Sequence, residues 1–147
     1  MAERSALTPM DVCHCFAVRQ AGRWISQLYD QHLAACGLRS TQYAILAQLD
    51  RLGSASIAQL AEAMVMDRTT ITRNVTPLER DGLLEIAAAQ GDRRRKEVRL
   101  SPRGSQALAA ARPHWRRAQQ AFERHFGADQ AAALRTLLRA VPEGHSG

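Results

Sequence analysis

The stretch SIAQLAEAMVMDRTTITRN at residues 56–74 contains two short amphipathic segments separated by only a few residues. Apolar side chains recur at helical spacing in both segments. They are Ile57, Leu60, Ala61 and Met64 in the first, followed by Ile71, Val75 and Leu78 in and just beyond the second. Asp67 precedes the second segment and is a favourable N-cap. Two short helices joined by a tight turn predict a helix-turn-helix.

The second of these helices, predicted over 68–81, presents polar and cationic side chains on its outward positions. They are Arg68, Thr69, Thr70, Thr72, Arg73 and Asn74. Arginine can make two bonds to guanine and asparagine two to adenine, while threonine hydroxyls can bind phosphate. A threonine-rich solvated face is the alternative, but threonine is a mediocre helix former. We interpret this helix as one that enters the major groove, with Ser56, Gln59 and Asp67 as further DNA contacts.

A basic β-hairpin is predicted directly after this helix, because apolar and polar residues alternate at 84–88 and again at 97–100. Pro77 inside the preceding helix is expected to bend it or weaken its last turn. Residues 91–103 hold six cationic and two acidic side chains, a local net charge of +4. The candidate DNA contacts at the tip are Asp92, Arg93, Arg94 and Arg95. We expect Arg94, near the centre of the tip, to enter the minor groove and Asp92 to orient one of the arginines.

Longer helices flank this central part. We predict helices over 9–36 and 41–52, the second capped by Ser40 or Thr41. After the hairpin, Ser101 and Pro102 open a helix that reaches about residue 126 and kinks near Pro113, and a last helix covers 128–141. The expected fold is mainly α with a small β-hairpin. It has a winged helix-turn-helix at 38–101 and dimerisation helices at 1–37 and 102–147.

Composition favours a polyanionic partner. The chain has 147 residues, of which 46% are apolar, and a net charge of +6. Its isoelectric point is about 10.2. A basic domain gains affinity for nucleic acid by releasing the counterions of phosphates. No run of residues is long and apolar enough for a membrane span, and residues 1–5 lack the apolar block of a signal peptide, so we expect a cytoplasmic protein.

Several short motifs together resemble the MarR (multiple antibiotic resistance regulator) family. They are TQYAIL at 41–46, SIAQLA at 56–61, DRTTITR at 67–73, LERDGL at 78–83, DRR at 92–94 and LSPRG at 100–104. The resemblance implies a homodimeric transcriptional regulator, usually a repressor, that binds palindromic double-stranded DNA. The apolar positions of the flanking helices agree, because a lone winged module does not need them. An enzyme, such as a peroxidase that uses Cys15, is the rival hypothesis, but the sequence has no resolving-cysteine pattern, phosphate loop or nucleophile elbow, so we expect neither enzymatic activity nor a cofactor.

The resemblance further implies a small anionic aromatic ligand in a crevice between the dimerisation helices and the DNA-binding part. The candidate residues are His14, Arg19, Trp24 and Tyr43, with His14 or Arg19 as the group that meets a carboxylate. The alternative is that His14 is an ordinary interface histidine and Tyr43 a core residue.

The three cysteines, Cys13, Cys15 and Cys36, are an odd number and form no disulfide framework. Metal binding is not expected, because Cys13 and Cys15 flank one histidine and no second ligand cluster follows. One branch of the MarR family senses organic hydroperoxides through a cysteine near the position of Cys15. Tyr29 matches one assisting tyrosine of that branch, whereas Ser40 stands where the other is expected. An inert interface cysteine is the alternative to this redox role. The alternative to DNA binding is a winged module that binds only protein, against which the dense arginines of the hairpin argue.

Overall fold

The computed structural model describes residues 6–143, so the predictions for 1–5 and 144–147 lie outside the described residues. The chain is mainly α with one antiparallel hairpin, as predicted. The elements are α1 (His14–Leu33), the short 3₁₀ helix η1 (Ala34–Cys36), α2 (Ser40–Leu52), α3 (Ile57–Met64), α4 (Arg68–Arg80), β1 (Leu84–Ala89), β2 (Asp92–Leu100), α5 (Pro102–Phe126) and α6 (Ala128–Glu143).

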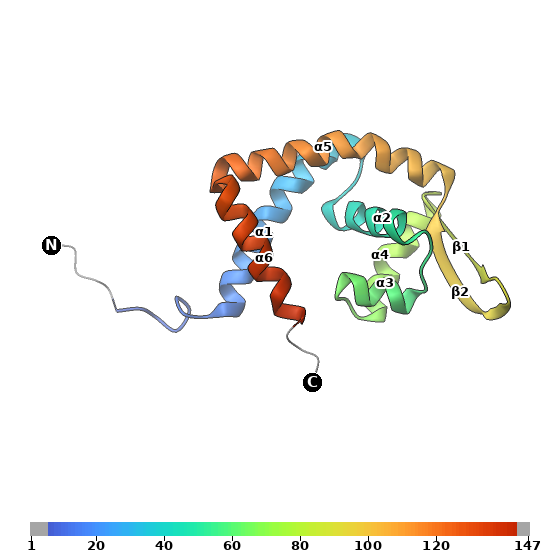
Figure 1. Cartoon of the computed structure of the whole chain (residues 1–147), viewed down its shortest axis with the longest axis horizontal. Helices are drawn as coiled ribbons and strands as arrows, with labels where there is room; N and C mark the ends of the chain where they lie inside the picture. The colour runs from blue at the N-terminus through green and yellow to red at the C-terminus, as the bar shows by residue number, and fades with distance from the viewer. Residues whose placement is uncertain (1–5, 144–147) are drawn as a thin grey trace.

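Figure 1 shows that the long helix α5 arches over the whole molecule. Helices α1 and α6 descend from one end of the arch. Helices α2, α3 and α4 lie under the other end, and the hairpin β1–β2, here called the wing, projects beyond them. We call α2–α4 and the wing together the winged module. Within residues 6–143, no helix combines the length and the apolarity needed to span a bilayer.

The main hydrophobic core lies in the winged module and against the underside of α5. Its fully buried side chains include Ile45, Leu46, Leu49, Leu60, Ile71, Val75, Leu78, Val98 and Leu108. Each element of the module contributes to it, because the amphipathic faces of the three helices and the inner face of the wing converge there. This packing fixes the orientation of α4 and the wing relative to each other.

The base of the wing is joined to its surroundings at two points. Ala55, just before α3, forms a β-bridge with Val98 of β2 that the sequence did not indicate. At the start of α5, Ser101 Oγ donates to the carbonyl of Gly82 at 2.5 Å and accepts from the amide of Gly104 at 2.9 Å. The predicted cap at Ser101 is therefore confirmed, and it also holds the turn between α4 and the wing.

Two predicted helix starts are wrong. Helix α1 begins at His14 and not at Pro9, because Asp11 Oδ2 accepts from both the amide and the hydroxyl of Thr8 at 2.7 Å and closes a separate turn. Cys13 then caps α1 through its sulfur, which accepts from the amide of Phe16. Helix α2 is not capped by Ser40 or Thr41. Ser40 is its first residue, and the side chain of Gln42 accepts from the amide of Arg39 at 3.0 Å.

Both prolines expected to disturb helices lie inside continuous ones. Helix α4 runs through Pro77 to Arg80, and α5 runs through Pro113 to Phe126. Pro77 has no amide hydrogen to offer the carbonyl of Arg73. One residue earlier, Thr76 Oγ1 donates to the carbonyl of Thr72 at 2.8 Å.

Candidate nucleic-acid interface

Helix α4 begins at a strong local cap. Asp67 Oδ1 accepts a hydrogen bond from the amide of Thr70 at 2.7 Å, as the sequence predicted. This bond, together with the nearby Arg73, holds the pKa of Asp67 below its usual range. A carboxylate at the cap also opposes the positive end of the helix dipole. The first turn of α4 is thereby fixed before any ligand arrives.

One face of α4 is open to solvent and carries the cationic and hydroxyl groups. Arg68, Thr69, Thr72 and Arg73 are exposed, and they line a shallow hollow of ≈530 Å³ with Thr76 and Pro77. The residues recur at i, i+1, i+4, i+5 and i+8, which extends the face by two turns along the helix. Thr76 is a member that sequence reasoning missed, although the same spacing pointed to it.

Two of the predicted outward residues are turned partly inward. Thr70 and Asn74 are half-buried. Asn74 Nδ2 donates to the carbonyl of Thr70 at 2.8 Å, one turn back along α4. Asn74 is therefore only partly outward, because a short polar side chain in a helix can bond to its own backbone, and its predicted contact with DNA stays a prediction.

Ser56 and Gln59 form a capping box at the start of α3. Ser56 Oγ accepts from the amide of Gln59 at 3.1 Å, and Gln59 Oε1 accepts from the amide of Ser56 at 2.9 Å. Gln59 remains exposed and Ser56 half-buried. Both polar groups are thus already used to begin the helix, and their predicted contact with DNA stays a prediction.

The arginines of the wing do not lie at its tip. The chain reverses at Gln90–Gly91, where Gly91 has φ of +85°, and strand β2 already begins at Asp92. Ala89 pairs with Asp92, whereas its neighbour Ala88 pairs with Lys96, so residues 93–95 bulge out of the ladder. The prediction of Arg94 at the centre of the tip is wrong in this respect. The turn consists of only two residues, Gln90 and Gly91, and the three arginines that follow form the bulge in β2.

Asp92 supports Arg94 through the backbone. Its Oδ1 accepts from the amide of Arg94 at 2.9 Å, and no cationic side chain of the described residues forms a salt bridge with it. The carboxylate therefore shapes the bulge, whereas we had expected it to orient an arginine side chain.

Most cations of the wing remain unpaired. Arg99 forms a cross-strand pair with Glu85 at 3.1 Å. Arg93, Arg94, Arg95 and Lys96 are exposed, and none of the four is within salt-bridge distance of a carboxylate anywhere in residues 6–143. Lys96 belongs to this group, although the sequence analysis did not predict it as a DNA contact. The four positive charges are free to meet an external anion.

Two grooves join the wing to the helix-turn-helix. One, of ≈410 Å³, is lined by the start of α3, by Arg68 of α4 and by Arg94, Arg95 and Lys96. The other, of ≈320 Å³, lies between α4 and the wing, with Thr72 and Thr76 on one wall and Arg93 and Lys96 on the other. Cations of both elements therefore line the first groove, whereas in the second the cations come from the wing alone and α4 adds Glu79.

The predicted ligand residues are not brought together within one protomer. Tyr43 is buried and stacks on Trp115 of α5, with ring centroids 6.0 Å apart. Trp24 stacks on His125, ten residues further along α5, which is about 15 Å away along the helix. His14 and Arg19 are exposed on α1 and precede Trp24, so they lie still further from Tyr43. The four side chains of one protomer therefore do not line a single crevice, and their predicted contact with a ligand stays a prediction.

The same spacing separates the residues of the redox hypothesis. Cys15 is exposed at the start of α1, and Tyr29 is fourteen residues later, about 21 Å along the same helix. The Tyr29 hydroxyl donates to Gln119 of α5. Within one protomer, Tyr29 cannot assist Cys15. Among residues 6–143, no three His, Cys, Asp or Glu side chains come close enough to hold a metal ion.

A capped helix with a cationic face, backed by a cationic wing, defines a winged helix-turn-helix DNA-binding protein. Residues 38–96 match the MarR family. The chain is 31% identical to the transcriptional repressor NicR of Pseudomonas putida over 90% of its own length and 85% of that protein. The chain belongs to the MarR family of transcriptional regulators, which are not enzymes.

Solved structures agree with this assignment. The M. tuberculosis regulator MosR, in a complex with DNA, has 32% identity and a TM-score of 0.76, covering 90% of this chain and 98% of its own. PcaV of Streptomyces coelicolor, in a complex with its natural ligand, has 25% identity and a TM-score of 0.82, covering 95% of this chain and 98% of its own.

Proposed function

We propose that this chain is a homodimeric repressor that binds a palindromic operator, with α4 of each protomer in the major groove and the wing at the adjacent minor groove. The observation that carries this proposal is the groove that Arg68 of α4 shares with Arg94, Arg95 and Lys96 of the wing, none of which forms a salt bridge with a carboxylate of the described residues. A groove with cations on both walls suits the phosphate strand that separates the major from the minor groove. A DNA-binding role also implies a cytoplasmic location.

The dimer is supported by apolar side chains that remain largely exposed in the described protomer. Val18 and Trp24 of α1, and Leu137 and Val141 of α6, are all exposed. Exposed apolar residues gathered on neighbouring helices are typical of a subunit interface. A twofold dimer would present its two α4 helices to half-sites about one helical turn apart, roughly 10 base pairs.

We further propose that a small aromatic acid modulates DNA binding, as the complex of PcaV with its natural ligand suggests for a relative. The best local support is at Tyr43, which is stacked on Trp115. Arg112 and Arg116 oppose the rise that burial causes in the pKa of Tyr43, so two cations lie near this aromatic pair. Arg112 also pairs with Asp50 of α2 at 2.8 Å, which couples this position to the winged module.

A binding assay tests the central claim. Fluorescence anisotropy with fragments of the DNA upstream of the chain's own gene should detect one palindromic site, with an affinity that falls steeply as salt increases. Arg124→Ala removes a positive charge at the end of α5 far from α4 and the wing. This variant is the control for loss of an arginine at the interface, and it should leave the affinity unchanged. Equal binding to scrambled and native fragments at moderate salt would refute sequence-specific regulation.

The redox alternative depends on Cys15, which is the exposed one of the three free cysteines. A Cys15→Ser variant should keep its DNA affinity and its response to aromatic acids if this alternative is incorrect. Loss of DNA binding on addition of an organic hydroperoxide, abolished by Cys15→Ser, would favour it instead.

A further inference from the structure

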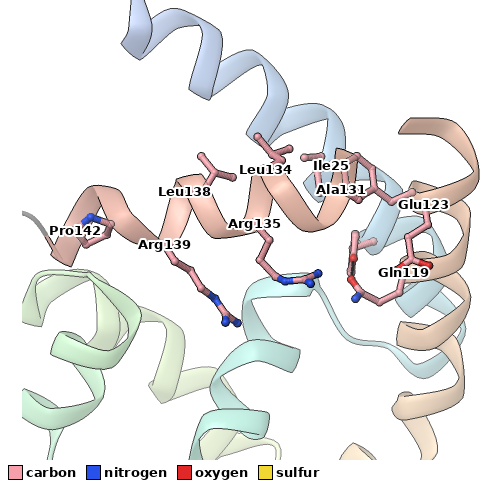
Figure 2. A pocket seen from close by; sticks show the side chains of 11 residues that line it. Ile25, Gln119, Glu123, Ala131, Leu134, Arg135, Leu138, Arg139 and Pro142 are labelled. Carbon is pink, nitrogen blue, oxygen red and sulfur yellow. Dashed lines mark hydrogen bonds between the residues drawn. The ribbon is translucent and has the colours of Figure 1, made fainter. Parts of the chain in front are cut away.

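Helices α1, α5 and α6 enclose an open cavity of ≈390 Å³ that is separate from the DNA-binding surface and from Tyr43. Figure 2 shows the side chains that line it. The apolar ones are mainly aliphatic, namely Ile25, Phe122, Ala131, Leu134, Leu138 and Pro142. Such a volume falls in the range of small-molecule sites, which are mostly apolar with a few placed polar groups.

The polar groups of the cavity carry an excess of positive charge. Arg135 and Arg139 extend from the same side of α6, whereas Glu123 is the single carboxylate in the lining. Neither arginine forms a salt bridge with any carboxylate of the described residues. Burial and the nearby Glu123 raise the pKa of Tyr29 while Arg135 opposes the rise, so these two charges lie near each other at that phenol. Arg139, one turn further on, is left to meet an external anion.

The length of the cavity indicates the shape of its ligand. Its lining follows α6 from Ala131 to Pro142, eleven residues or about 16 Å along the helix axis. We propose that this cavity is an effector site for aliphatic monocarboxylic acids, with the carboxylate at Arg139 and the chain along Leu134 and Leu138. A guanidinium pairs with a carboxylate through parallel hydrogen bonds, and the alkyl chain replaces water on the apolar wall.

The second copy of the chain has another face of α6 to occupy. Leu137 and Val141 are absent from the cavity lining, and they are 69% and 73% exposed. At 3.6 residues per turn, they lie roughly 110° around the helix axis from the centre of the cavity face. Helix α6 can therefore contribute one face to a dimer and the other to the acid site. An acid bound there would contact the helix that positions the two protomers, a regulatory effect that depends on the function proposed above.

Isothermal titration of the full-length chain with octanoate tests the site directly. Octanoate should bind, while 1-octanol, which has the same chain without the charge, and benzoate, which is too short for the groove, should each bind at least about tenfold more weakly. Arg139→Gln should weaken octanoate at least about tenfold, and Arg124→Gln, an equal loss of charge outside the cavity, should not. No octanoate binding at millimolar concentration, or equal binding by Arg139→Gln, overturns the proposal.

Sedimentation velocity separates the acid from the second copy as the occupant. Arg139→Gln should keep the oligomeric state of the wild-type chain. Dissociation of the oligomer by this variant, with octanoate affinity unchanged, would assign the cavity to the protomer interface and overturn the acid site. DNA binding without octanoate is measured in parallel. If Arg139-dependent octanoate binding occurs without specific DNA binding, the repressor proposal fails and the acid site stands. If specific DNA binding occurs without octanoate binding, the acid site is overturned and the repressor proposal stands.

Discussion

The winged module and the helix pair α1 and α6 use their apolar side chains in opposite ways. In the module, every helix buries at least two side chains, and the wing buries Leu84 and Val98. In contrast, α1 buries only Leu33 of its 20 residues and α6 only Ala131 of its 16. The module thus finds its core within one chain. The helix pair leaves much of its apolar surface exposed, which is the surface that the proposed dimer would cover.

The largest effect is expected where the module meets α5. A Cβ added at Gly104 would lie 1.9 Å from the carbonyl oxygen of Leu83, which already accepts from the amide of Ser101 at 3.1 Å. Because the contact is with backbone, Gly104→Ala should destabilise the fold by about 3 kcal/mol or prevent folding. Thermal unfolding followed by circular dichroism measures the loss.

Gly22→Ala in α1 is the matched control for Gly104→Ala. A Cβ at Gly22 meets no atom of the described chain within 4 Å. Alanine in an exposed helix should therefore stabilise α1 by about 0.5–1 kcal/mol. A loss of stability instead would indicate that the second copy approaches α1 at this glycine, and would show that the glycine serves the interface.

A charge on the exposed face of α6 should dissociate the proposed dimer and leave the winged module folded. Leu137→Asp places a carboxylate where the proposed dimer buries an apolar side chain, so dimer affinity should fall by about 100-fold or more. Sedimentation equilibrium measures the affinity, and circular dichroism should show unchanged helix content in the module. An unchanged dimer would mean that the second copy binds elsewhere.

Within the module, Arg73 tests the reading of bases by α4. It is exposed on the face that includes Thr69 and Thr72. Arg73→Ala should cost about 1–3 kcal/mol at the preferred operator and relax the preference at one base position. Anisotropy titrations against single-base operator variants detect this. A uniform loss across all sequences would identify Arg73 as a phosphate contact.

Arg94 should have a smaller effect that does not depend on sequence. Arg94→Ala removes one unpaired cation from the bulge of the wing and should reduce the slope of log affinity against log salt by about one. All operator variants should weaken in parallel, because the minor groove is read mainly through its shape and potential. An unchanged slope would exclude Arg94 from the interface.

The features that the sequence predicted are those determined over a few residues. The helix-turn-helix, the cap at Asp67 and the start of α5 at Ser101–Pro102 depend on side chains that bond to amides three residues away. The start of α1 was mistaken because Pro9 fits the first turn of any helix, and nothing nearby shows that Asp11 closes a turn on Thr8 instead.

Features that depend on distant contacts were missed. The bridge between Ala55 and Val98 joins residues far apart in the sequence and leaves no periodic pattern. The separation of the candidate ligand residues within one protomer was missed for the same reason. Whether Trp24 and Tyr43 share a crevice depends on where α1 and α2 cross α5, and that is set by packing. The cavity at Arg139 was likewise invisible, because α6 carries leucines on two faces and only the folded chain shows which of them has a hollow beside it.

The smallest expected effect concerns the turn between α3 and α4, where one residue of the winged module has a strained backbone. Val65 has φ of +52° and ψ of +48°, the left-handed conformation that a β-branched residue avoids, and it is 72% exposed. The left-handed conformation costs a non-glycine residue about 1–2 kcal/mol. Glycine removes this cost, but its more flexible unfolded chain offsets about 0.5–1 kcal/mol of the gain. Val65→Gly should therefore stabilise the module by about 0.5–1 kcal/mol.

Ala63→Gly, at an exposed position inside α3, is the matched control and should destabilise by about 0.5–1 kcal/mol, since it gains flexibility without relieving strain. Chemical denaturation resolves the two opposite signs. If Val65→Gly destabilises as much as Ala63→Gly, the valine side chain must make a stabilising contact that offsets its backbone strain. If the variant is more stable but binds operator DNA less tightly, the branched side chain at the turn helps to position α4 on DNA. The backbone strain at Val65 would then be retained because it orients α4 for DNA binding.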